Sequence, residues 1–367
     1  MSVTSPDDIL GIIMNIVYIG FFAVFYFFST KIRTLQSTFA LSRSLKKLRA
    51  MRDKTKNEII SAMSTEKTNK ESINKRVNNL MDQFIIKPSD IDPAGVTKRY
   101  EHVLDASDKS VKTEIKSIAP TASEQQIQNL QNLIETGQAL NKMYRVVRNY
   151  YILGKKQGSQ YQMVQIEMQL PSIMEEAEAY AAFTDAFREG KPIGDGIGPL
   201  ATSKLMVEQE KFEVAQEVVA AKTAIDNRQV IVAKAKGPGG TVGKIGDAVQ
   251  YLIEANGGNI SLIIMVDAAL KLEGEDSGSI AEGVGAAIGG PGIDQYKIEE
   301  IATKYKVPVY AIVVKESIKE VLAPMTSAIT KAADNVVDVF RRVIQERTQK
   351  NDVVLIIGVG NTMGIAQ

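Results

Sequence analysis

The pattern of hydrophobic and polar positions divides the chain into three parts. Residues 9–28 form an almost unbroken apolar run, residues 31–189 carry apolar positions at helical spacing, and residues 190–367 alternate short apolar runs with glycine-rich loops. An apolar helix of about 20 residues is long enough to cross a bilayer. The pattern therefore predicts a transmembrane anchor over 1–30, a basic juxtamembrane helix or stalk over 31–80, a helical region over 81–189 and an α/β domain over 190–367.

The first apolar run is interpreted as a membrane span and not as a cleaved signal peptide. Asp7 and Asp8 precede it, and no cleavage site of small residues comes after it. Residues 31–56 then carry nine Lys or Arg against one Asp. Because basic flanks stay on the cytoplasmic side, we expect a single-pass protein of the cell membrane with its N-terminus outside and its C-terminal domain in the cytoplasm. A buried core helix is the alternative for this run.

The basic segment has three competing interpretations. Its apolar positions recur at steps of three, four and six residues, which is typical of a helix that pairs with a partner helix, as in a homo-oligomer. The same charges also suit a helix lying on anionic lipid. A solvated linker accounts for them equally well.

The last part of the chain predicts an α/β fold with a mainly parallel sheet covered by helices. Expected strands are 229–235, 262–266, 307–314 and 353–358, and expected helices between them include 248–255 and 296–305. Strand, loop and helix alternate in this order, which is typical of parallel strands joined by crossovers. Ligands of such sheets bind at the carboxyl ends of the strands.

Composition narrows the chemistry. The chain has no cysteine and a single histidine, His102, so thiolate sites, disulfides and histidine-rich zinc sites are excluded. The net charge of +1 gives no argument for a nucleic-acid partner. The sequence identifies no cofactor, and if a metal binds, oxygen ligands favour a hard divalent cation such as magnesium.

Acidic residues at the ends of the glycine-rich loops are the candidate catalytic groups. Asp195, Asp247 and Asp267 each end a predicted strand or begin a predicted helix beside a glycine or other small residue. Carboxylates that converge on one cleft can share a proton for acid–base catalysis or bind a cation. Helix N-capping is the alternative for Asp195 and Asp247.

Two glycine loops are candidate ligand-binding segments, because backbone N–H groups before a helix hold phosphate or carboxylate well. Tight turns explain the same glycines without a ligand. The predicted ligand-binding residues are Gly237, Gly239, Gly240, Thr241, Lys244, Asp247, Gly289, Gly290 and Gly292. Glu273 and Glu275, just beyond Asp267, are the predicted metal ligands.

Several motifs together resemble an archaeal family of single-pass membrane proteins of unknown function. Besides the N-terminal apolar run they are GKPIGDGIGP, GPGGTVGKIGD, VDAALKLEGEDSG, AIGGPGIDQYKIEE and GVGNTMGIAQ. The likeness covers nearly the whole chain. It implies an archaeal cell membrane and carries no established activity.

Residues 190–367 are also similar, more distantly, to germination proteases and hydrogenase-maturation proteases. The shared features are the Asp195–Pro199 helix start, Asp267-Ala268 at a strand end, the Gly289–Gly292 loop, Val307-Pro308-Val309 and the segment 358–361. Their order differs as in a circular permutation. The likeness implies that Asp195 and Asp267 form an acidic pair, and no counterpart of the histidine metal ligand is present.

These observations predict a membrane-anchored cytosolic domain that binds a small anionic or peptide ligand and is a candidate peptidase-like hydrolase. Asp195 and Asp267 would be its acid–base groups, with Asn361 orienting them. A non-enzymatic oligomeric membrane scaffold is the alternative, and a nucleotide-binding regulator is a third.

Overall fold

The computed structural model describes residues 6–64, 70–88, 93–157 and 160–366. Contacts divide the chain into two compact units, one of residues 1–50 with 142–174 and one of residues 51–141 with 175–367. Three long helices run through both units. They are α1 (Pro6–Met63), α4 (Glu124–Gln157) and α5 (Gln160–Glu189).

The first unit is made of stretches of these three helices. Its buried side chains include Leu41 and Leu48 of α1, Val147 of α4 and Met163 of α5, all at 0% or 1% exposure. Gly154 lets α5 approach α4, because a Cβ there would lie 2.4 Å from the side chain of Met163. The unit is thus held by apolar contacts between three helices.

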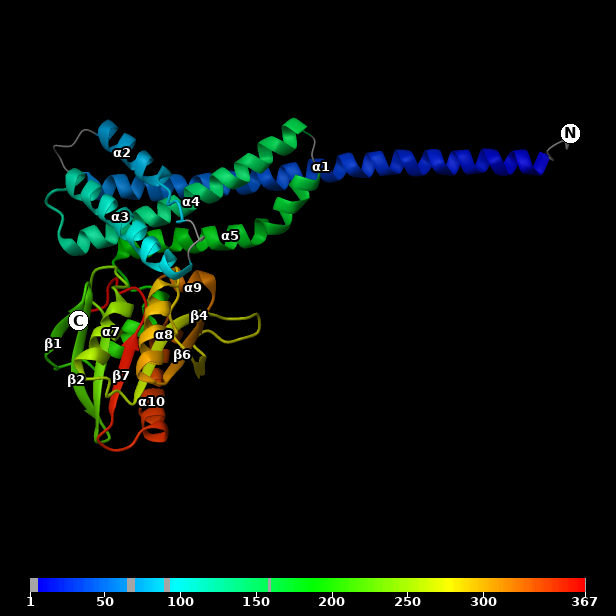
Figure 1. Cartoon of the computed structure of the whole chain (residues 1–367). Helices are drawn as coiled ribbons and strands as arrows, with labels where there is room; N and C mark the ends of the chain where they lie inside the picture. Colours follow the sequence, from blue (N-terminus) through cyan, green and yellow to red (C-terminus); the bar gives the residue numbers. More distant parts are fainter. Residues whose placement is uncertain (1–5, 65–69, 89–92, 158–159, 367) are drawn as a thin grey trace. The chain divides into compact units, whose positions relative to one another are not determined.

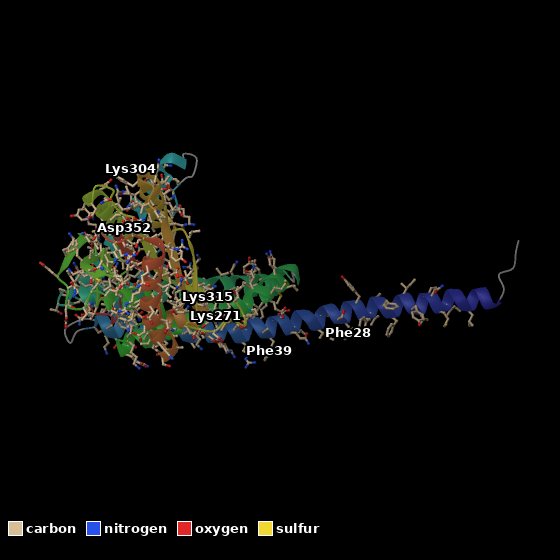
Figure 2. All side chains as sticks on the ribbon, turned by 90° about the horizontal axis from the view of Figure 1, so that it is seen from below. Phe28, Phe39, Lys271, Lys304, Lys315 and Asp352 are labelled. Atoms are coloured by element: carbon tan, nitrogen blue, oxygen red, sulfur yellow. The ribbon has the colours of Figure 1, made fainter. Side chains whose placement is uncertain are left out.

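The predicted transmembrane helix is wrong. In the described part of the chain, no helix combines the length and the apolarity that crossing a bilayer requires. The apolar run is also not an element of its own, because α1 continues for 58 residues through the basic segment as far as Met63. The large side chains of this run that the structure describes are exposed, as Figure 2 shows for Phe28, and so is Phe39 further along the same helix.

The second unit begins with a helical layer. It comprises the end of α1, α2 (Lys70–Asp82), α3 (Pro93–Ile118), the first half of α4 and the end of α5. Their apolar faces form one core, which includes Ile59, Ile115 and Leu133. Ile193, just before the first helical turn of the α/β part, and Met363, after its last strand, are buried in the same core, so loops of the α/β part pack on the helical layer within this unit.

The α/β part contains one sheet of seven strands in the order β1-β2-β3-β7-β4-β6-β5. The strands are β1 (Lys211–Ala215), β2 (Val218–Ile225), β3 (Arg228–Ala235), β4 (Leu262–Leu270), β5 (Ile280–Val284), β6 (Val309–Glu316) and β7 (Val353–Gly358). The central strands β3, β7, β4 and β6 are parallel. The outer strands β1, β2 and β5 pair in the antiparallel sense.

Helices cover both faces of the sheet (Figure 1). One face packs on α6 (Ile197–Ser203) and α10 (Ser327–Arg347), with Ile264, Ile356 and Phe340 in its core. The other packs on α7 (Ile245–Ala255) and α8 (Ile293–Tyr305), with Met265 and Ile357 in its core. Successive side chains of β4 and β7 point alternately into the two cores. Because both faces of these strands are buried, the strands are apolar along most of their length.

The α/β class was predicted correctly, but the sheet is mixed and not mainly parallel. The strand predicted over 353–358 matches β7, and those predicted over 229–235 and 307–314 match β3 and β6 to within two residues. β1, β2 and β5 were missed. β1 and β5 lie at the two edges of the sheet and bury only part of their side chains, and the second half of β2 is half-buried or exposed, so all three give a weak apolar signal.

Candidate functional site

The parallel strands bring their carboxyl ends to one edge of the sheet, and the candidate catalytic residues lie along that edge. Asp267 lies near the end of β4, and Asn361 comes three residues after β7. Asp195 lies in the short 3-10 helix η1 (Gly194–Gly196) that leads into α6. Residues distant in sequence are thereby brought to a common place, as predicted for α/β sheets.

Asp195 and Asn361 are joined directly. The backbone N–H of Asn361 donates to Asp195 Oδ2 at 2.7 Å, and the side-chain Oδ1 of Asn361 accepts from the N–H of Met363 at 2.9 Å. Glycines make this approach possible. A Cβ on Gly360 would lie 1.8 Å from the carbonyl oxygen of Asp195, and one on Gly198 would lie 2.2 Å from that of Val359.

Asp267 is buried, at 8% exposure. Its Oδ1 accepts from the N–H of Ala268 at 2.8 Å, and its Oδ2 accepts from the N–H of Gly289 at 3.2 Å. Both of these donors belong to the backbone. The second bond ties the carboxylate to the glycine loop that precedes α8.

A third carboxylate, Glu316 at the end of β6, belongs to the same group and was missed from the sequence. It is fully buried, and within the described residues neither carboxylate oxygen has a hydrogen-bond partner. It lies against η1, since a Cβ on Gly194 would come within 2.1 Å of its Oε2. The signal that could have revealed it is the period of two in β6, where Ile312, Val314 and Glu316 share the buried face.

Burial raises the pKa values of all three carboxyls, and repulsion from neighbouring carboxylates adds to the rise at Asp267 and Glu316. Burial, followed by the charge of Asp195, raises the pKa of Asp267 to about 7. Burial, followed by the charges of Asp195, Glu320 and Asp267, raises the pKa of Glu316 to about 8. Burial also raises the pKa of Asp195, against the lowering effect of the Asn361 N–H. We call Asp195, Asp267 and Glu316 the acid cluster.

The loop after β3 is held against α4. The Gly240 N–H donates to Asn129 Oδ1 at 2.7 Å, and Asn132 Nδ2 donates to the Gly240 carbonyl at 2.8 Å. A Cβ on Gly239 would lie 1.7 Å from Gln128 Oε1, and one on Gly240 would lie 2.2 Å from Asn132 Nδ2. The close approach of α4 is therefore a structural reason for these two glycines.

The other predicted residues of this loop are also engaged. Thr362 Oγ1 donates to the carbonyl oxygens of Gly239, at 2.7 Å, and of Thr241, at 3.0 Å. A Cβ on Gly237 would lie 1.8 Å from the carbonyl oxygen of Ile365. The C-terminal segment is thus fastened to the loop.

Lys244 and Asp247 lie in a network of alternating charges. Lys244 Nζ lies 2.5 Å from Asp105 Oδ1 and 3.4 Å from Glu101 Oε1. Lys297 Nζ of α8 lies 2.7 Å from the same Glu101 oxygen and 2.5 Å from Asp247 Oδ1. We call these five residues the ion-pair network. Asp247 thus forms an ion pair with Lys297, and Lys244 is paired with carboxylates of α3.

The predicted metal ligands lie apart from the contacts of the acid cluster. Glu275 Oε2 lies 3.4 Å from Lys315 Nζ and accepts from the N–H of Leu272 at 2.7 Å. Lys271 Nζ donates to the Glu275 carbonyl at 3.3 Å, and Figure 2 shows Lys271 and Lys315 beside each other. Glu273 is exposed. Within residues 6–64, 70–88, 93–157 and 160–366, no three Asp, Glu or His side chains are grouped so that they could hold a metal ion.

Glycine is required before α8 for a different reason than in the loop after β3. Gly290 and Gly292 adopt φ of +91° and +84°, and a Cβ on either, or on Gly289, would meet nothing within 4 Å. Positive φ favours glycine at positions 290 and 292. Of the three, Gly289 contacts the acid cluster, through its N–H.

A cleft of about 720 Å³ opens beside this edge, bounded by α3, α4 and the loop after β3. Gly240, Thr241 and Lys244 of the predicted ligand-binding residues line it, together with Asn361. Its volume is in the range of small-ligand sites, about 300–1,000 Å³. Asn361 thus lies in the cleft wall while its backbone N–H holds Asp195.

Comparison with known families gives two matches that succeed each other along the chain. Residues 15–190 match a model described as the N-terminal domain of a protein of unknown function, DUF1512, and residues 193–366 match the DUF1512 C-terminal domain. No curated protein and no solved structure matches the chain. The likeness to two protease families and the archaeal origin receive no support from these matches. The chain belongs to the DUF1512 family.

Proposed function

We propose that the α/β domain is a hydrolase that uses Asp195 and Asp267 as proton-transferring carboxyls. The observation that carries the proposal is the acid cluster itself. The two carboxyls lie at the carboxyl ends of the parallel central strands, the charge of Asp195 raises the pKa of Asp267, and the hydrogen bonds that both accept come from backbone N–H groups. Titratable groups with strongly shifted pKa values cluster at functional sites.

The chemistry needs one proton on the pair. The ionised carboxylate takes a proton from water as the water oxygen attacks the carbonyl carbon of the substrate. The protonated carboxyl gives its proton to the leaving group as the bond from carbon to that group breaks. A pKa near 7 suits this exchange, because the group can hold or release a proton near neutral pH.

Asn361 and Gly289 position the two carboxyls. The Asn361 N–H fixes Asp195, and the Gly289 N–H fixes Asp267. Because Asp267 is 8% exposed, substrate must displace the glycine loop 285–292 to reach it. Gly285, Gly290 and Gly292 have no atom within 4 Å of their Cβ positions, so a movement of the loop has to break mainly the packing of residues 286–288 on the core and the bond from Gly289.

The test is hydrolysis of peptide and carboxylic ester libraries by the full chain and by Asp267→Asn. We expect a loss of at least about 100-fold, the usual contribution of a general acid or base. Asp338→Asn is the matched control, because Asp338 is 77% exposed on α10. Equal hydrolysis by Asp267→Asn, or no hydrolysis of any library by the unaltered protein, would contradict the proposal.

A second candidate function is that of an oligomeric scaffold. It is supported by the run of exposed apolar side chains along α1, including Val17, Phe21 and Phe25 at 60% exposure or more. Exposed apolar patches of this extent mark interaction surfaces. Light scattering of the full chain and of a form lacking residues 1–40 tests it. If both forms have the same number of chains per particle, self-association through residues 1–40 is excluded.

A further inference from the structure

We propose that the cleft beside the acid cluster binds a short zwitterionic peptide of about three residues, with its amino end toward Asp108 and Glu135 and its carboxylate toward Lys112 and Lys116. The inference rests on the proposed function, since it names the substrate class of that site. Four observations carry it: the separation of charge along the cleft, its length, the amides between its two ends, and the position of Asn361.

Charge is separated along the walls of the cleft. Asp105 and Asp108 come before Lys112 and Lys116 along α3, and all four line the cleft. Lys109 stands between the two groups. A ligand with one positive and one negative end matches this order better than a simple anion, which would meet the carboxylates as well as the lysines.

The start of α4 lies beside the basic end of the cleft. Glu124 Oε1 lies 3.8 Å from Lys112 Nζ and its Oε2 lies 3.4 Å from Lys116 Nζ, so two lysines face one carboxylate and the basic end keeps one net positive charge. Glu135, eleven residues further along α4, lines the cleft and adds to its acidic end. Lys244 pairs with Asp105 at 2.5 Å, whereas Asp108 and Glu135 form no ion pair with a Lys or Arg of the described chain, so the acidic end keeps two carboxyls for a ligand.

The separation of the two ends fixes the length of the ligand. Asp108 and Lys116 are eight residues apart on one helix, and at about 1.5 Å per residue their backbones are separated by roughly 12 Å. An extended chain spans about 3.3–3.6 Å per residue, so a peptide of about three residues covers this distance. A single amino acid is too short to reach from Asp108 to Lys116.

Side-chain amides lie between the charged ends. Gln128, Gln131 and Asn132 of α4 line the middle of the cleft. A side-chain amide has both donors and an acceptor, which is the complement of a peptide backbone. Asn132 and Gln128 are also held by the Gly240 carbonyl and by Glu217, each at 2.8 Å, so their orientation is set before a ligand arrives.

The inner wall of the cleft connects to the acid cluster. Asn361 lines the cleft, and its backbone N–H donates to Asp195. A peptide held between the two charged ends therefore lies beside the carboxyl that the proposed hydrolysis requires.

The test is calorimetric titration of the full chain with trialanine in three forms: with both termini free, with an acetylated amino end, and with an amidated carboxyl end. Each cap removes one charge and leaves the backbone unchanged. We expect the free peptide to bind and each cap to weaken binding by at least about tenfold. Equal affinity for the three forms, or no binding of the free peptide, would overturn the proposal.

Two variants assign the ends. Lys116→Met should abolish the penalty of the amide cap and leave that of the acetyl cap, and Asp108→Asn should do the reverse. Lys304→Met is the matched control, because Lys304 lies on α8 away from the cleft residues and is 61% exposed. If the two cleft variants behave like Lys304→Met, the assignment is wrong.

The outcomes for the cleft and for the hydrolase differ. Charge-dependent binding of trialanine without its cleavage would support the cleft and contradict the hydrolase. Cleavage that depends on Asp267, acting on a substrate whose affinity is unchanged in Lys116→Met and Asp108→Asn, would support the hydrolase and contradict the cleft.

Discussion

Two groups of charged side chains near the same sheet edge have opposite electrostatics. In the ion-pair network, each carboxylate has a lysine within 2.7 Å, and positive and negative side chains alternate among α3, the start of α7 and α8. In the acid cluster, Asp195 and Asp267 accept hydrogen bonds from backbone N–H groups, and the Glu316 oxygens have no partner among the described residues. Position at the sheet edge is shared, so it does not by itself separate a structural carboxylate from a functional one.

The difference lies in how each group offsets the loss of water. Paired charges compensate each other, and exposed or half-buried pairs add only modestly to stability. Buried carboxylates without a cation beside them have no such compensation. They therefore keep a proton at a pH where an exposed carboxyl would have released it. The acid cluster therefore costs stability at neutral pH, which is expected of a site kept for function and not for folding.

The largest effect is expected from Gly360→Ala, which disturbs the contact that builds the acid cluster. Gly360 has φ of +131°, and a Cβ there would lie 1.8 Å from the Asp195 carbonyl oxygen. Strain and overlap should lower the free energy of unfolding by about 3 kcal/mol. Urea denaturation measures this.

Gly257→Ala is the matched control for that variant. Gly257 also has positive φ, +62°, but nothing lies within 4 Å of its Cβ position. It should cost about 1 kcal/mol, from backbone conformation alone. Equal losses in the two variants would show that the close contact at Asp195 is unimportant.

The next effect is the pH dependence of stability. Burial raises the pKa of Asp267 to about 7 and that of Glu316 to about 8, whereas both titrate near pH 4 in an unfolded chain. The folded protein thus binds protons that the unfolded chain has lost. Their contribution is complete below about pH 4 and is lost as pH rises toward 7–8, at about 1.4 kcal/mol per pH unit for each proton.

Asp267→Asn and Glu316→Gln should each remove one such contribution. Relative to the unaltered protein, both variants should gain stability between about pH 5 and pH 8, as measured by urea denaturation at fixed intervals of pH. Asp247→Asn, in the ion-pair network, should show no such gain. If the free energies of unfolding of Glu316→Gln and of the unaltered protein differ by the same amount throughout this pH range, Glu316 does not hold a proton in the folded state.

The smallest effect is expected from the ion-pair network. Lys297→Met removes the lysine that joins Glu101 to Asp247, and should cost about 1 kcal/mol because its side chain is 18% exposed. The loss should shrink in about 1 M salt, which screens exposed charges. Arg342→Met, which breaks a more exposed pair with Glu282, should cost less. A salt-independent loss in Lys297→Met would point to packing in place of charge.

Local pattern was enough to place much of the α/β part. The predicted strand 353–358 coincides with β7. Asp267 was expected directly after the strand 262–266, whereas β4 continues to Leu270 and Asp267 lies inside it, three residues before its end. Uniform apolarity of centrally placed strands is a local signal, so it can be read without knowing their neighbours. The antiparallel strands at the edges of the sheet could not be predicted in this way, because their side chains are partly exposed and their sequences are not uniformly apolar.

The apolar run of residues 9–28 shows the limit of reading composition in a fixed window. The sequence indicated a separate membrane element, whereas α1 extends over 58 residues. The end of a helix depends on the residues beyond the window and on the partners against which the helix packs, and neither is contained in the window.

By itself the sequence determined which residue types stand at the ends of the strands, because the period of the apolar positions and the glycine loops mark those ends. Only the tertiary structure decided which carboxylates are neutralised and which are not. Lys297 reaches Glu101 across 196 residues of sequence, and Glu316 is buried because η1 closes over the end of β6. Pairing and burial are properties of position in space, so residues with the same local sequence signal became structural at Asp247 and candidate catalytic groups at Asp195 and Asp267.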